Sequence, residues 1–229
     1  MGPDRQRHLT CLRPNLIIQP RSAPGLAFPA LSPHSPHARL AAPLRCPLLS
    51  VPDSQDWLAA DHHSTSLGPD LHDWLYVDKG SLTRRLTELA AGEFSVTPLT
   101  EGWQILRNDE CSALGVADGS QGWVREVYLR GHQRPWVFAR SVAARSALER
   151  SGLDLPHLGS RSLGELLFSD PAFTRGPLQA RRYPDTWLPQ EVRQAQLWAR
   201  RSCFSQGDLR VLVAEVFLPA LWQAAQIAN

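Results

Sequence analysis

The segment Gly122–Val142, GWVREVYLRGHQRPWVFARSV, decides the fold. It contains two runs rich in Val, Leu and aromatic residues on either side of Gly-His-Gln-Arg, so it predicts two antiparallel strands joined by a tight turn. The segment Leu197–Pro219, LWARRSCFSQGDLRVLVAEVFLP, has the same form, with a predicted turn over residues 205–208. Two such hairpins, without βαβ alternation, predict an antiparallel sheet.

Helical patterns lie before and between the two hairpins. Apolar residues repeat at helical spacing in residues 71–75 and again in residues 81–92, where Ser81 can cap the start and Gly92 the end. EFSVTPL, residues 93–99, predicts a further strand, and residues 141–152 predict a helix. Ser162 and Glu165 have the spacing of a capping box. We therefore predict an α+β fold, a single antiparallel β-sheet with helices packed on it.

The N-terminal part of the chain differs in composition from the rest. Residues 1–55 carry about half of the 19 prolines and none of the eight tryptophans, so this part cannot easily bury a core. Its prolines interrupt any amphipathic transit helix, and no secretory signal core is recognisable. We predict a disordered extension over residues 1–55, a single folded domain over residues 56–229 and a cytoplasmic protein.

Composition and charge exclude several classes of protein. The 229 residues are 43% hydrophobic and 20% charged, as in an ordinary soluble protein, and no apolar run approaches the length of a membrane helix. A net charge of +2 does not suggest a nucleic-acid partner. The four cysteines lack zinc spacing. His62 and His63 are adjacent, and neighbouring side chains point in different directions, so the two are poorly placed to bind one metal ion together. We therefore predict no metal site.

Each hairpin places one charged residue in an apolar row. In the second hairpin, Glu215 alternates onto the same face as Val213 and Phe217, and the opposite face of that strand is apolar as well. In the first hairpin, Arg125 alternates onto one face with Val127, and Glu126 falls on the other. A buried charge is costly unless it is paired or completed by a ligand. Both positions therefore need an explanation.

Two interpretations fit the residues alone. Arg125 and Glu215 could form a structural salt bridge between neighbouring strands. Alternatively, Arg125 could present its planar fork to a ligand carboxylate while Glu215 binds the other polar end of the same ligand. Arg200 and Arg201 point to opposite faces of their strand, so at most one of them reaches a pocket, and neither receives a role.

Several motifs together resemble the bacterial chorismate pyruvate-lyases, which make 4-hydroxybenzoate for ubiquinone. The resemblance runs from about Leu71 to Trp222 and does not include the proline-rich extension. Gly80 looks inserted relative to the family, and the segment from about residue 177 to 196 is longer than usual. The motifs are LHDWLYVDKGSLTRRL, EGW, WVREVYLRGHQRPWVFARSV, LGSRSLGELLFSDPAFTRG and LWARRS followed by LVAEVFLPALW.

The resemblance implies a closed internal cavity under two helical flaps, a function and a set of site residues. It implies that Arg125 and Glu215 are the catalytic residues, with Arg125 binding the ring carboxylate of the substrate and Glu215 its 4-hydroxyl end. Leu82 and Leu163 are the further substrate-binding residues that it implies. The implied reaction removes pyruvate from chorismate, needs no cofactor and is carried out by a monomer. A non-catalytic sensor that binds a small aromatic acid in the same fold is the alternative, because a buried Arg and acid also suit binding without turnover.

Overall fold

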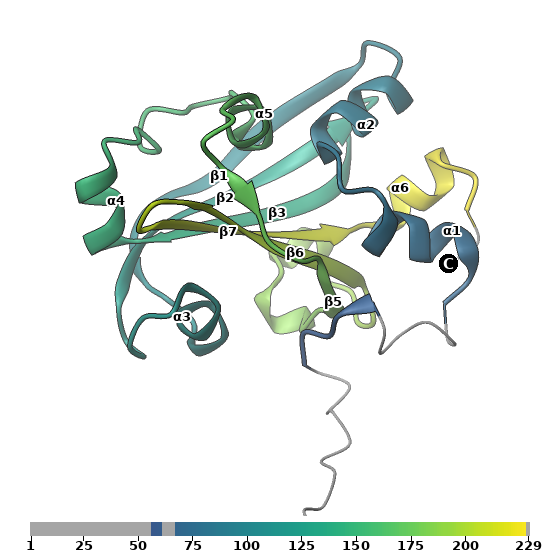
Figure 1. Ribbon diagram of the computed structural model, residues 1–229. Helices are drawn as coiled ribbons and strands as arrows, with labels where there is room; N and C mark the ends of the chain where they lie inside the picture. Colours follow the sequence, from purple (N-terminus) through teal and green to yellow (C-terminus); the bar gives the residue numbers. More distant parts are fainter. Residues whose placement is uncertain (1–55, 61–66, 228–229) are drawn as a thin grey trace, which may run out of the picture. The chain divides into compact units, whose positions relative to one another are not determined.

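The computed structural model describes residues 56–60 and 67–227. Its centre is one antiparallel sheet of seven strands, in which the neighbours follow the order β1-β2-β3-β7-β6-β4 and β5 also pairs with β6 (Figure 1). The predicted extension over residues 1–55, and His62 and His63, lie outside the described residues. The strands are β1 (Phe94–Ile105), β2 (Gln121–Gly131), β3 (Arg134–Ala144), β4 (Thr174–Arg175), β5 (Gln179–Arg182), β6 (Trp198–Gln206) and β7 (Leu209–Phe217).

Both predicted hairpins are confirmed. Strands β2 and β3 are joined by a two-residue turn at His132 and Gln133, whose φ angles are 49° and 62°. Positive φ angles at both positions are required in the type of two-residue turn that fits the twist of the strands. Strands β6 and β7 are joined at Gly207 and Asp208, and Gly207 also has a positive φ. The pairing of β3 with β7 joins the two hairpins into one sheet.

The helices only partly follow the sequence-based predictions. Ser81 caps α2 as predicted, with its hydroxyl accepting from the Arg84 amide, although α2 ends before Gly92. The helix predicted over residues 141–152 is confirmed as α4, but it begins only at Arg145, because residues 141–144 continue β3. The short elements after β1, around β4 and after β7 were not predicted. The helices are α1 (Pro69–His72), continued by a π-helical turn (Asp73–Val77), α2 (Leu82–Leu89), α3 (Asn108–Leu114), α4 (Arg145–Ser151), α5 (Leu163–Ser169) and α6 (Pro219–Ala224), with 3-10 turns at Asp185–Trp187 and Gln190–Val192.

Helices cover both faces of the sheet. Helices α2 and α5 lie on one face and α3 on the other (Figure 1). On the α2 and α5 face, two apolar clusters bury opposite ends of the strands. The first contains Leu82, Leu129 and Phe217, and the second contains Leu163 and Val211. Because Arg125 and Glu215 lie between these ends on their strands, the polar site interrupts the core of this face.

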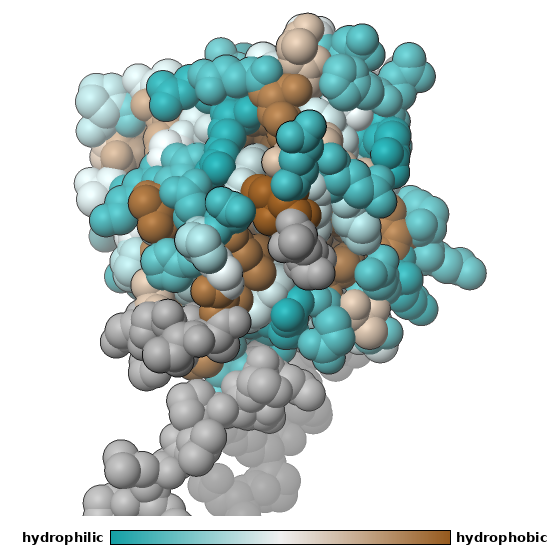
Figure 2. Space-filling model, turned by 90° about the vertical axis from the view of Figure 1, so that its right-hand side faces the viewer, coloured by the Kyte–Doolittle hydropathy of each residue, from teal (hydrophilic) through white to brown (hydrophobic). Residues whose placement is uncertain are grey.

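The face of the molecule that carries α1 and α6 has a mixed surface. Hydrophobic residues there lie scattered among hydrophilic ones (Figure 2). Beneath it, Trp74, Phe217 and Trp222 pack edge to face or tilted, with ring centroids 5.2–6.1 Å apart. Within the described residues, no helix has the length and apolar character needed to cross a membrane.

The β2–β3 turn depends on a close approach between Gly131 and Trp136. A Cβ atom on Gly131 would lie 2.2 Å from the buried Trp136 ring. We therefore expect Gly131→Ala to lower the free energy of unfolding by about 1–3 kcal/mol, the usual cost of overpacking. Gly102→Ala in β1 is the matched control, since a Cβ there meets nothing within 4 Å. Denaturant unfolding of both variants tests this, and equal stabilities would contradict it.

Candidate active site

A small pocket lies between the sheet and the N-terminal ends of α2 and α5. Its volume is about 40 Å³, enough for a few water molecules, whereas ligand pockets usually measure about 300–1,000 Å³. Its floor comes from β2, β3 and β7. Arg125, Glu215 and Leu163, all predicted as site residues, lie in its wall together with Thr83, Val96, Val127, Leu129, Ala139, Ser141, Ser162, Gly164 and Val213.

Strand register explains why Arg125 and Glu215 reach one pocket. Arg125 lies opposite Ser141, which in turn lies opposite Val213 of β7. Glu215 is two residues beyond Val213 on the same strand and therefore shares its face. The two charged side chains thus project from the same side of the sheet. Strand β3 lies between their strands, and their positions differ by two residues along the strand direction.

Arg125 is almost fully buried and held by three hydrogen bonds. Its Nη1 donates to Glu101 of the neighbouring strand β1. Its Nη2 donates to the carbonyl oxygens of Gly159 and Arg161, at 2.7 and 3.0 Å. Burial lowers the pKa of the Arg125 guanidinium, and the Glu101 carboxylate opposes that effect. Since an arginine has five N–H donors, two remain for other partners.

Glu215 is held by a different arginine. Its Oε2 accepts from Nε of Arg200 at 2.7 Å. Arg200 is completely buried, and its Nη1 also donates to the carbonyl oxygens of Trp74 (2.7 Å) and Asp78 (3.2 Å). The interpretation of a direct Arg125–Glu215 salt bridge is therefore wrong, because each residue has its own ionic partner within the described part of the chain.

The helix ends above the pocket are joined by a hydroxyl pair. Thr83 Oγ1 of α2 and Ser162 Oγ, the cap of α5, are 2.7 Å apart. Ser162 also accepts from the Glu165 amide at 3.2 Å, so the predicted cap is confirmed. Leu82, the remaining predicted site residue, begins α2 and is buried in the adjacent apolar cluster, while its neighbour Thr83 lines the pocket.

A sequence profile for chorismate lyase matches residues 51–227. The chain belongs to the chorismate lyase family. A protein named "Probable chorismate pyruvate-lyase" from Pseudomonas aeruginosa (strain UCBPP-PA14) is 66% identical over 179 residues, which are 78% of this chain and 99% of that protein. A protein of the same name from Pseudomonas putida is 65% identical over 173 residues, 76% of this chain and 93% of that protein.

Solved structures with a similar arrangement are more distant in sequence. The effector domain of PhnF from Mycobacterium smegmatis has 13% identity and a TM-score of 0.41, covering 62% of this chain and 90% of that chain. The family resemblance and the α+β fold predicted from the sequence are thus confirmed by the profile match and the sheet.

Two residues that hold the side chains of this pocket were missed from the sequence. Glu101 of β1 and Arg200 of β6 hold Arg125 and Glu215, respectively. Neither residue has a predicted role, although Arg200 is one of two arginines of which at most one was expected to reach a pocket. On the opposite face, Glu126 accepts from Arg140 Nη1 at 2.8 Å, which confirms its predicted side of the sheet.

The described residues offer no metal centre in this family member. Residues 56–60 and 67–227 contain no group of three His, Cys, Asp or Glu side chains close enough to hold a metal ion. What the pocket does offer is a buried cation with unused donors at one end and a carboxylate with an unused oxygen at the other. This arrangement suits a small, flat ligand with an anionic end and a hydroxyl end.

Proposed function

We propose that this chain is a chorismate pyruvate-lyase that converts chorismate into 4-hydroxybenzoate and pyruvate. The observation that carries the proposal is that Arg125 and Glu215 line one pocket while bonded to different partners. The names of relatives that are 65–66% identical over nearly their whole length support it. We further propose that it works as a monomer in the cytoplasm, where its product enters ubiquinone synthesis.

The proposed reaction is an elimination that makes the ring aromatic. The bond between ring carbon C3 and the ether oxygen breaks, and its electron pair leaves with the enolpyruvyl group. The hydrogen on C4 leaves as a proton, and its bonding electrons complete the aromatic ring. The leaving enolpyruvate takes up one proton at its methylene carbon to become pyruvate. Atoms and electrons balance without an oxidant or a further reactant.

Arg125 and Glu215 have the groups that such a substrate needs. The N–H groups of Arg125 that remain are on Nε and Nη1, at different edges of the guanidinium, and one of them would bind the ring carboxylate. Oε1 of Glu215 accepts no hydrogen bond from any described residue, so it is free to accept from the 4-hydroxyl group. Leu163 would pack on the ring, and Leu82 would join it from α2. Holding the ring in one reactive conformer supplies much of the acceleration in such reactions.

The pocket must enlarge before a six-membered ring can enter. The N-terminal ends of α2 and α5 form its roof, and they are joined by the Thr83–Ser162 hydroxyl pair. Breaking one such hydrogen bond costs about 1 kcal/mol, which is small enough for frequent opening. We therefore propose that these two helices act as the flaps that admit the substrate and close over it.

The decisive experiment mixes the purified full chain with chorismate and follows 4-hydroxybenzoate by absorbance and pyruvate with a coupled dehydrogenase. Equal amounts of the two products are expected. The sensor alternative predicts that 4-hydroxybenzoate binds but that no pyruvate appears. Failure to release pyruvate would overturn the proposed function.

Glu101 places a negative charge beside the carboxylate site proposed at Arg125. Glu101→Gln keeps a hydrogen-bond acceptor for Arg125 but removes the repulsion of the incoming carboxylate. We expect 4-hydroxybenzoate to bind about fivefold more tightly, equivalent to roughly 1 kcal/mol. Glu149→Gln, which alters an exposed carboxylate paired with Arg145, is the control and is expected to leave the affinity unchanged. Calorimetric titration measures both, and weaker binding by Glu101→Gln would contradict the expectation.

A further inference from the structure

Arg175 is a largely buried cation without an ionic partner. It is the second residue of the two-residue strand β4, and its Nε donates to Ser202 Oγ of β6 at 2.8 Å. Its Nη1 donates to the carbonyl oxygens of Lys79 (2.8 Å) and Gly80 (3.3 Å), just before α2. Among the described residues no carboxylate forms an ion pair with Arg175, and its Nη2 has no hydrogen bond.

Arg200 also has unused donors, and they are completely buried. Its Nη2 has no hydrogen-bond partner among the described residues. In a guanidinium group, Nη2 and Nε form one edge, and Nε of Arg200 donates to Glu215. The unsatisfied Nη2 therefore lies beside the Glu215 carboxylate. An unsatisfied buried donor is costly, so it indicates a partner that the protein chain itself does not supply.

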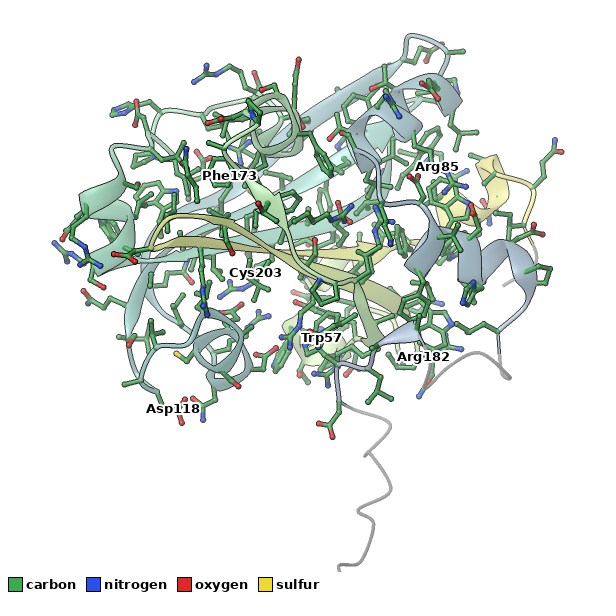
Figure 3. All side chains as sticks on the ribbon, in the orientation of Figure 1. Trp57, Arg85, Asp118, Phe173, Arg182 and Cys203 are labelled. Atoms are coloured by element: carbon green, nitrogen blue, oxygen red, sulfur yellow. The ribbon has the colours of Figure 1, made fainter. Side chains whose placement is uncertain are left out.

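Arg175 and Arg200 both lie beside the Glu215 end of the pocket, behind the residues that line it. Arg200 is opposite Glu215 in the β6–β7 pairing, and Ser202, which binds Arg175, is opposite Val213. Glu215 and Val213 both line the pocket. Phe173, just before β4, lies on the α5 side of the sheet, whereas Cys203 of β6 points to the other side (Figure 3).

The local ion pairs leave Arg175 without a carboxylate in direct contact. Arg200 is paired with Glu215. Arg85 is paired with both Asp73 and Asp78, which are the other carboxylates near the start of α2. The three arginines and three carboxylates balance in number, but Arg175 is the arginine of the three that has no carboxylate within ion-pair distance among the described residues. Burial lowers the pKa of Arg175, and Arg200 adds to this effect, while the carboxylates of Glu215 and Asp78 oppose it.

We propose that Arg175 and Nη2 of Arg200 form a second carboxylate subsite, which binds the carboxylate of the enolpyruvyl arm of the substrate. This inference rests on the proposed function. Chorismate carries two carboxylates, and Arg125 accounts for only the one on the ring. The arm is attached next to the 4-hydroxyl carbon and so reaches the Glu215 end of the pocket. The same cations would stabilise the negative charge that develops on the departing enolpyruvate.

The second subsite predicts that substrate and product respond differently to the loss of Arg175. Chorismate would use both anion subsites, whereas 4-hydroxybenzoate would use only the one at Arg125. Arg175→Gln is therefore expected to lower kcat/KM for chorismate by about 30-fold or more, as expected when one partner of a buried charge pair is truncated. The dissociation constant of 4-hydroxybenzoate is expected to change less than about twofold, since the product lacks the arm.

The experiment compares Arg175→Gln and Arg175→Lys with the unaltered full chain. Chorismate turnover and titration with 4-hydroxybenzoate are measured on each, and retained product binding shows that a variant is folded. Arg175→Lys keeps the charge and is expected to recover part of the lost kcat/KM. The matched control is Arg182→Gln in β5, whose guanidinium donates to the Gln196 carbonyl away from the pocket.

Each outcome decides between the possible roles of Arg175. Unchanged kcat/KM in Arg175→Gln would overturn the subsite. A loss of 4-hydroxybenzoate binding as large as the loss of turnover would also overturn it, because Arg175 would then only support the fold of the pocket. If the unaltered chain releases no pyruvate, the proposed function fails first. That failure is distinguishable, since it appears before any variant is made.

Discussion

Arg125→Met is expected to lower kcat/KM for chorismate by about 100-fold or more. Truncating one partner of a buried, hydrogen-bonded charge pair costs about 2–5 kcal/mol, and each 1.4 kcal/mol is a factor of ten. The affinity for 4-hydroxybenzoate is expected to fall by a similar factor, because the product keeps the ring carboxylate. Steady-state kinetics and calorimetric titration measure the two effects. Parallel losses would distinguish Arg125 from Arg175, for which only the substrate is affected.

The main alternative explanation for such a loss is damage to the fold. Removing Arg125 leaves Glu101 without its cation and the carbonyl groups of Gly159 and Arg161 without a donor. The double variant Glu101→Gln/Arg125→Met removes the unpaired charge. Arg130→Met, in the same strand but bonded to Thr97 and Gln133, is the control for the substitution. If the double variant bound 4-hydroxybenzoate as the unaltered chain does, the assignment of Arg125 would be wrong.

Alternation along the strands was enough to single out Arg125 and Glu215 from the sequence, but it left a salt bridge and a ligand pocket both open. A strand buried on both faces has few reasons to contain a charge, so Arg125 and Glu215 stood out against Val, Leu and Phe neighbours. Alternation also gave the correct side for each residue, because the side-chain period of a strand is two. It could not show what each charge contacts, since that depends on which strands are neighbours.

The partner of Glu215 could have been found from the second hairpin. Gln206 and Leu209 flank its two-residue turn and face each other. Arg200 lies six residues before Gln206, and Glu215 lies six residues after Leu209, so these two also face each other. A regular two-residue hairpin fixes that register, so the two residues must be cross-strand neighbours on one face. Arg200 has no predicted role because alternation alone, without this register, does not pair it with Glu215.

Glu101 and Arg175 could not have been found in this way. The pairing of β1 with β2 shifts between Pro98 and Thr100, so simple alternation from the start of β1 does not give the side of Glu101. Arg175 lies in a strand of only two residues, which is too short to show any periodicity. Both positions are fixed by tertiary contacts that a single sequence does not reveal.

Glu215→Leu is expected to lower both stability and turnover. Its loss leaves Arg200 completely buried and without its carboxylate, and breaking a buried ion pair in this way costs about 3–5 kcal/mol of unfolding free energy. Turnover is expected to fall by at least about 100-fold, because the proposed acceptor for the 4-hydroxyl group is gone. Denaturant unfolding and the pyruvate assay measure the two losses separately.

The double variant Arg200→Met/Glu215→Leu tells these two roles of Glu215 apart. Replacing a whole buried ion pair with apolar side chains is often neutral for stability, so we expect the double variant to regain most of the lost unfolding free energy. Turnover is expected to stay at or below the level of Glu215→Leu, because neither substitution restores a group that binds the 4-hydroxyl and the double variant also removes Arg200 from the proposed second carboxylate subsite. The exposed pair Arg145–Glu149, replaced in the same way, is the control. If the stable double variant regained turnover, Glu215 would be only the structural partner of Arg200, and the polar end of the pocket would need another residue.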